Sequence, residues 1–140
     1  MIWLLPVALA AKINIVASTS DLAYFAKGIG GEMVEVSYIA LPASDIHFVD
    51  ARPSYIVKVA KADIVLKVGL ELDLWMDLII DGSRNGRLVV VDCSRNVPVL
   101  EKPTQKVDAS MGDVHPLGNP HYCLLYRPRV PKLPIILLPP

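Results

Sequence analysis

Three histidines are the side chains of this 140-residue sequence whose positions best favour a chemical role. His47 follows a predicted strand, and His115 and His121 follow a later one, so loops from both strands can bring imidazoles to one edge of a sheet. Neutral imidazole is a common metal ligand in proteins. The pattern indicates a metal site, and the alternative, that these are ordinary solvated or hydrogen-bonded loop histidines, stays open at this point.

Other chemistries find less support in the sequence. Prolines around His115 and His121 exclude a helical i,i+4 zinc motif, and there is no Gly-rich phosphate loop and no G-x-S-x-G elbow. Cys93 and Cys123 are interpreted as free thiols. Acidic residues near 71–77 are expected on the solvent face of a helix; they are Glu71, Asp73 and Asp77.

The elements that must position the histidines alternate along the chain. Short β-branched runs are predicted to be strands at 12–18, 33–40, 63–69 and 87–94, with helices between them at 19–28, 53–62 and 72–81. This order predicts an α/β fold: a four-stranded parallel sheet joined by right-handed crossovers and flanked by helices. Such sheets bind ligands beyond the carboxyl ends of their strands, where the histidine loops lie.

Charge and hydropathy limit the classes of partner. The 14 Lys and Arg residues balance 14 Asp and Glu residues, which argues against a nucleic-acid partner. Hydrophobic residues make up 53% of the chain, yet no apolar run reaches the roughly 20 residues of a membrane-spanning helix. The composition is that of one globular domain, or part of one.

The two ends differ in composition from the body. Residues 1–10 carry no charge, and Ala8-Leu9-Ala10 offers the small-x-small pattern of a signal-peptidase site, so residues 1–11 are predicted to be a partial signal peptide. Residues 123–140 contain five prolines and no acidic residue, and they are predicted to be an irregular tail.

Four motifs in register resemble the metal-binding, substrate-binding proteins of zinc and manganese ABC importers, the cluster A-I periplasmic family. They are Ser44-Asp45-Ile46-His47-Phe48-Val49-Asp50-Ala51-Arg52-Pro53-Ser54, Ala62-Asp63-Ile64-Val65, Gly69-Leu70-Glu71-Leu72-Asp73-Leu74-Trp75 and Gly118-Asn119-Pro120-His121-Tyr122. The resemblance covers roughly residues 12–122, the expected amino-terminal lobe.

The resemblance implies a fold and a site. In this family two α/β lobes, each with a four-stranded sheet, are joined by a long helix and hold one zinc or manganese ion between them. His47 and His121 match the two histidine ligands of the amino-terminal lobe, although Ile46 stands where proline is usual. His115 matches a position that often carries histidine in some members without being the usual ligand.

The function implied is that of an extracytoplasmic, or periplasmic, solute-binding protein rather than an enzyme. It captures a divalent metal ion, Zn²⁺ or Mn²⁺, and delivers it to an ABC permease in the cytoplasmic membrane. In the family the chain continues after the second histidine motif into the linking helix and the second lobe, whereas here residues 123–140 depart from that pattern. The sequence is therefore expected to be truncated to one lobe, with a frameshift near codon 123 as one explanation.

Two alternatives to a working receptor lobe stay open on sequence alone. One is a non-functional fragment of a metal receptor. The other is a metal-dependent hydrolase that uses the three histidines with Asp45 or Asp113, because an open three-ligand zinc site can activate water.

Overall fold

The computed structural model describes residues 11–105, 107 and 114–126. Residues 1–10 of the predicted signal peptide and residues 127–140 of the predicted tail lie outside this part of the chain. Within it, the predicted alternation of strands and helices is confirmed from the first strand to the fourth. In the described part of the chain, no helix combines the length and the apolar character needed to cross a bilayer.

The four strands form one parallel sheet, as predicted. They are β1 (Ile13–Ala17), β2 (Val34–Tyr38), β3 (Ile64–Lys67) and β4 (Val89–Asp92), in the spatial order β2-β1-β3-β4. Each strand is shorter than its predicted range. Because β2 and β4 are the two outer strands, the histidine loops that follow them start from opposite sides of the sheet.

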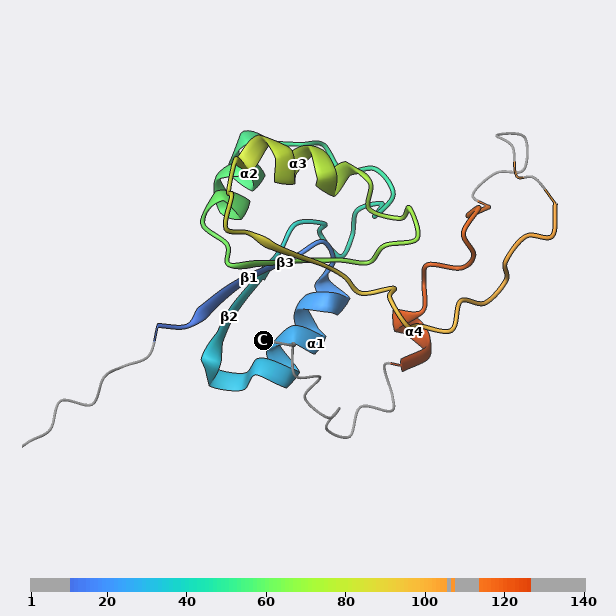
Figure 1. The fold of residues 1–140 in the computed structure, drawn as a ribbon, viewed down its shortest axis with the longest axis horizontal. Coiled ribbons are helices and arrows are strands. Elements are labelled where there is room, and N and C mark those ends of the chain that lie inside the picture. Colours follow the sequence, from blue (N-terminus) through green and yellow to red (C-terminus); the bar gives the residue numbers. More distant parts are fainter. Residues whose placement is uncertain (1–10, 106, 108–113, 127–140) are drawn as a thin grey trace, which may run out of the picture.

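Helices cover both faces of the sheet (Figure 1). Two of them, α2 (Pro53–Ala60) and α3 (Trp75–Ser83), lie on one face, and α1 (Ser20–Gly30) lies on the other with the short α4 (Cys123–Tyr126). A 3₁₀ turn, η1 (Gly31–Met33), leads from α1 into β2. Helix α1 ends two residues beyond its predicted range, and Gly31, which follows it, has a φ of 52°, which favours glycine.

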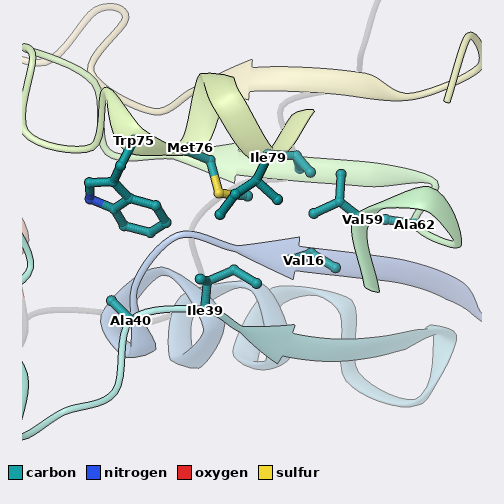
Figure 2. Packing of buried hydrophobic residues seen from close by; sticks show 9 residues of the cluster. Val16, Ile39, Ala40, Val59, Ala62, Trp75, Met76 and Ile79 are labelled. Atoms are coloured by element: carbon teal, nitrogen blue, oxygen red, sulfur yellow. The ribbon is translucent and has the colours of Figure 1, made fainter. Parts of the chain in front are cut away.

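The larger hydrophobic core lies between the sheet and the pair α2 and α3 (Figure 2). Val16 and Val65 of the two central strands meet Met76 of α3, and all three are fully buried. Burying a side chain of this size contributes about 1.5–3 kcal/mol. Residues of the same cluster are Ile39, Ala40, Val59, Ala62, Trp75 and Ile79.

A second core lies on the face covered by α1 and includes the segment that carries His121. Ala17 follows Val16 in β1, so its side chain points to this opposite face of the sheet. The buried members are Ala17, Leu22, Ala23, Val68, Leu72 and Tyr122. Because Tyr122 directly follows His121, this core also holds the second histidine loop in place.

Helix α3 begins at Trp75 rather than at the predicted residue 72, and this shift corrects the prediction for Asp73. Leu70 and Glu71 have φ values of 52° and 65°, so the chain makes a turn before the helix starts. Asp73 is only 1% exposed and does not face solvent. Its Oδ2 accepts the N–H of Val68 at 2.6 Å and its Oδ1 accepts the N–H of Gly69 at 3.0 Å. Buried peptide N–H groups need acceptors, and a carboxylate supplies two.

The segment predicted as an irregular tail starts with a short helix, which corrects that prediction at its first residues. Cys123–Tyr126 are helical as α4. The first proline of the segment is Pro128, and proline disfavours helical conformation only from the residue before it onward, so one helical turn fits ahead of it.

Both cysteines are free, as predicted. Cys93 and Cys123 pack against the second core. Burial raises the pKa of Cys93 to about 12 and that of Cys123 to about 11. Both thiols are therefore protonated, and weak nucleophiles, at neutral pH.

Asp73→Ala is expected to lower the free energy of unfolding by about 3 kcal/mol, because it leaves two buried N–H groups without an acceptor. Asp77→Ala is the matched control in the same region: its carboxylate is half-exposed and pairs with Lys67, and a surface pair contributes about 0–1 kcal/mol. Urea unfolding followed by circular dichroism measures both. Equal losses in the two variants would contradict the role given to Asp73.

Candidate metal centre

The first histidine loop is held by the indole of Trp75. This loop follows β2 and carries Asp45, Ile46 and His47. Trp75 lies at the first position of α3, is almost fully buried, and donates its Nε1–H to the carbonyl of Ile46 at 2.9 Å. The bond joins the residue before His47 to α3, which connects β3 to β4, so the loop that follows the outer strand β2 is held toward the other half of the sheet.

The second histidine loop is held by Pro120 and Tyr122 on either side of His121. Pro120 is fully buried, and the buried hydroxyl of Tyr122 donates to the carbonyl of Val68 at 2.7 Å. Val68 directly follows β3, so this loop is attached to the end of a central strand. His121 itself stays half-buried and faces the cavity described below.

Gly118 lets this loop pack closely against residues 99–102. Its φ is +102°, and a Cβ at this position would lie 2.3 Å from Cγ1 of Val99 and 2.9 Å from the carbonyl oxygen of Leu100. The next residue, Asn119, donates its N–H to that same carbonyl at 2.9 Å. A side chain at 118 would therefore push apart the two segments that line the cavity.

The two loops bring the three histidines together. Nε2 of His47 lies 3.3 Å from Nε2 of His115, and one ring nitrogen from each of the three histidines lies within 4.8 Å of the others. All three rings are half-buried, and they line a cavity of about 380 Å³ with Glu101 and Asn119. Loops after the second and fourth strands thus meet beyond the carboxyl ends of the strands, while the assignment of His47 and His121 as ligands stays a prediction.

Asp45 orients the ring of His47. Its Oδ1 accepts the backbone N–H of His47 at 2.9 Å and lies 2.8 Å from Nδ1 of the ring. These hydrogen bonds lower the pKa of the Asp45 carboxyl, which is therefore ionised at neutral pH and can only accept hydrogen bonds. Nδ1 then carries the hydrogen, and the lone pair of Nε2 points toward the other histidines. A carboxylate behind the ligating ring is the usual arrangement around metal-bound histidine.

His121 is held as a neutral imidazole. Its backbone N–H donates to Oδ1 of Asn119 at 2.9 Å, which fixes the turn that carries it. Burial, and to a smaller extent the nearby His47, lower the pKa of His121 below its ordinary value of 6.5. A neutral ring at physiological pH keeps a lone pair for a metal ion.

Glu101 is the residue of this region that sequence reasoning missed. Its Oε2 accepts from Nδ2 of Asn119 at 2.7 Å, and its side chain lines the same cavity as the histidines. It lies in an irregular segment with no strand or helix pattern, so no sequence signal pointed to it. Asp113, considered with Asp45 for a hydrolase, lies outside the described residues.

The structure is an α/β lobe with a cluster of three histidines at the carboxyl edge of its sheet, and comparison with known proteins identifies its family. The family model for the periplasmic component A of zinc-uptake complexes, ZnuA, matches residues 15–126. The chain therefore belongs to this family. The proteins to which the family model refers are periplasmic, hence extracytoplasmic.

Individual relatives share the fold over part of their length. The iron-binding protein YfeA of Yersinia pestis is 25% identical over 124 residues, which are 88% of this chain and 39% of the relative. The periplasmic zinc-binding protein TroA from Treponema pallidum is 25% identical, with a TM-score of 0.59 over 69% of this chain and 34% of its own.

FpvC from Pseudomonas aeruginosa, solved in complex with Mn²⁺, is 19% identical, with a TM-score of 0.63 over 81% of this chain and 38% of its own. At that identity the similarity concerns the fold alone. Across these relatives, the chain spans about 34–39% of their length.

In metal-free protein, His121 is expected to titrate below pH 6.5 in an NMR titration of the ring protons. The unfolded chain takes up this proton at a higher pH than the folded chain. The stabilisation from burying the neutral ring is therefore present above pH 6.5 and is lost as the pH falls through the folded-state pKa.

His47→Ala is the informative variant for this titration. The variant removes the electrostatic effect of His47 on the pKa of His121, which is the smaller cause of its lowering, but leaves His121 buried. The titration midpoint of His121 should therefore rise and still remain below 6.5. A midpoint at or above 6.5 in the unsubstituted chain would show that the ring is not desolvated as described.

Proposed function

We propose that this chain is the metal-capturing lobe of an extracytoplasmic receptor that binds a divalent metal ion, Zn²⁺ or Mn²⁺, for delivery to an ABC permease. The observation that carries the proposal is the cluster of half-buried imidazoles at the carboxyl edge of the sheet, in a chain that belongs to the ZnuA family. His47 and His121 are the ligands, and the ion is cargo rather than a resident cofactor.

The chemistry of the donors supports a transition metal over Mg²⁺ or Ca²⁺. Imidazole nitrogen suits zinc and its neighbours, whereas magnesium and calcium prefer oxygen ligands. By their names, the relatives bind zinc, iron and manganese. The oriented Nε2 of His47 and the neutral ring of His121 are ready to bind such an ion without first losing a proton.

The carboxylates near His47 and His121 support a binding site rather than a catalytic site. Of the carboxylates described here, that of Asp45 is engaged with the ring of His47 and that of Glu101 with the amide of Asn119. Each therefore serves to hold a neighbouring group rather than to activate water. A capture site needs only ligands in place and an open approach for the ion, and the cavity beside the histidines provides that approach.

The same proposal assigns the segments of the chain. Residues 12–122 are the metal-binding lobe, residues 1–11 act in export, and residues 123–140 are the segment that follows the lobe in the chain, starting with Cys123, which packs against its second core. The two imidazoles leave coordination positions that donors outside this lobe would complete, as the resemblance to two-lobed receptors implies. The receptor would then release the same ion to the permease without forming or breaking covalent bonds.

His47→Ala and His121→Ala are each expected to weaken zinc binding by more than about 10-fold, since even loss of an outer-shell partner of a ligand costs about 10–100-fold. Isothermal titration of the metal-free chain with Zn²⁺ at pH 7.5 measures the effect. Titrations with Mn²⁺ and Mg²⁺ test selectivity, and Mg²⁺ should give no heat of binding.

Phe48→Ala is the matched control for these variants. Phe48 neighbours His47 in the same loop, but its side chain is 80% exposed, so its removal should leave the affinity for zinc unchanged. Unchanged zinc affinity in both histidine variants would contradict the proposed site.

A further inference from the structure

We propose that His115 is a third metal ligand, so that this lobe holds a complete set of three imidazoles by itself and selects Zn²⁺ over Mn²⁺. This inference deepens the proposed function and rests on it. The resemblance to metal receptors assigns two ligands to this lobe, whereas the structure places three histidines around one point.

The distance between two ring nitrogens is the first argument. A zinc–nitrogen bond is about 2.0–2.1 Å long, so two ligands of a tetrahedral ion are separated by roughly 3.3–3.4 Å. Nε2 of His47 and Nε2 of His115 are 3.3 Å apart. The pair already has the spacing of one edge of a zinc tetrahedron.

The position of His121 completes the set. Its ligand nitrogen lies within 4.8 Å of the other two, and its ring stands at 65° to that of His47 and 71° to that of His115. The centroid of its ring lies 5.7 Å from that of His47 and 5.8 Å from that of His115, close to the 5.3 Å between those two, so the three rings surround one point. Rotation of the side chain within the cavity can close the remaining separation, and the backbone stays in place.

A shared proton is the competing explanation for the 3.3 Å contact. A proton can bridge Nε2 of His47 and Nε2 of His115, but it joins only two nitrogens. It leaves the approach of His121 without an explanation. A metal ion binds all three lone pairs at once, and the hydrogen bond to Asp45 already directs the lone pair of His47 toward the centre.

Charge and donor type set the preference for the ion. Three neutral imidazoles leave the two positive charges of the ion uncompensated. The carboxylate of Asp45, hydrogen-bonded to the ring of His47, and that of Glu101, on the cavity wall, lie close enough to offset these charges. Nitrogen-rich sites favour zinc, whereas manganese prefers oxygen donors. The fourth position stays open to water or to a donor from outside the lobe.

X-ray absorption of the zinc-loaded full chain is the direct test, because the fine structure counts imidazole ligands. Three are expected for the unsubstituted chain and two for His115→Ala. Calorimetry should show zinc affinity at least about 10-fold weaker in that variant, while Mn²⁺ binds the unsubstituted chain at least about 10-fold more weakly than Zn²⁺.

Leu117→Ala is the matched control in the same loop, since this side chain is 48% exposed and does not line the cavity. His115→Gln, which keeps a polar side chain of similar length, serves if the alanine variant unfolds. A count of two imidazoles in the unsubstituted chain overturns the inference.

The histidine variants separate this inference from the proposed function. Loss of affinity in His47→Ala and His121→Ala, with none in His115→Ala, overturns the third ligand and leaves the receptor function standing. No zinc binding by the unsubstituted chain overturns both. Equal loss in all three variants supports the three-imidazole site.

Discussion

The peptide groups of Val68, at the end of the central strand β3, are the constraint on which the site depends. Val68 is buried, so its N–H and its carbonyl must both find partners inside the protein. Asp73 accepts the N–H, and Tyr122 donates to the carbonyl. Two side chains far apart in the sequence therefore meet at one residue, and the turn before α3 and the second histidine loop are both attached to the sheet there.

Attachment at Val68 brings together two loops that the strand order starts at opposite sides of the sheet. The outer strands β2 and β4 start the two histidine loops at opposite sides of the sheet. The loops converge because a hydrogen bond holds each of them near the centre of the sheet. Trp75, which follows the Asp73 turn, donates to the carbonyl of Ile46 in the first loop. Tyr122 of the second loop donates to the carbonyl of Val68. Each anchor lies directly beside a histidine, because Ile46 precedes His47 and Tyr122 follows His121.

The electrostatics of the centre follow from the same packing. Partial burial keeps His121 neutral, and the ionised Asp45 fixes which nitrogen of His47 is free. The neutral ring of His121 keeps a lone pair at neutral pH, which is the form of imidazole that binds a metal ion. The chain belongs to the ZnuA family, and its three histidines lie together at the carboxyl edge of the sheet.

The sequence by itself determined the order of elements and the edge of the sheet at which the histidine loops lie. β-branched runs, a proline at the first position of α2 and a glycine after α1 act locally, so they can be read without the fold. Only the tertiary structure decided the later start of α3, the burial of Asp73 and the place of Glu101 at the cavity. The burial of Asp73 and the start of α3 depend on the peptide groups of Val68 and Gly69, which need acceptors inside the packed protein. The place of Glu101 depends on its contact with Asn119 in a distant segment. Local periodicity in the sequence encodes neither cause.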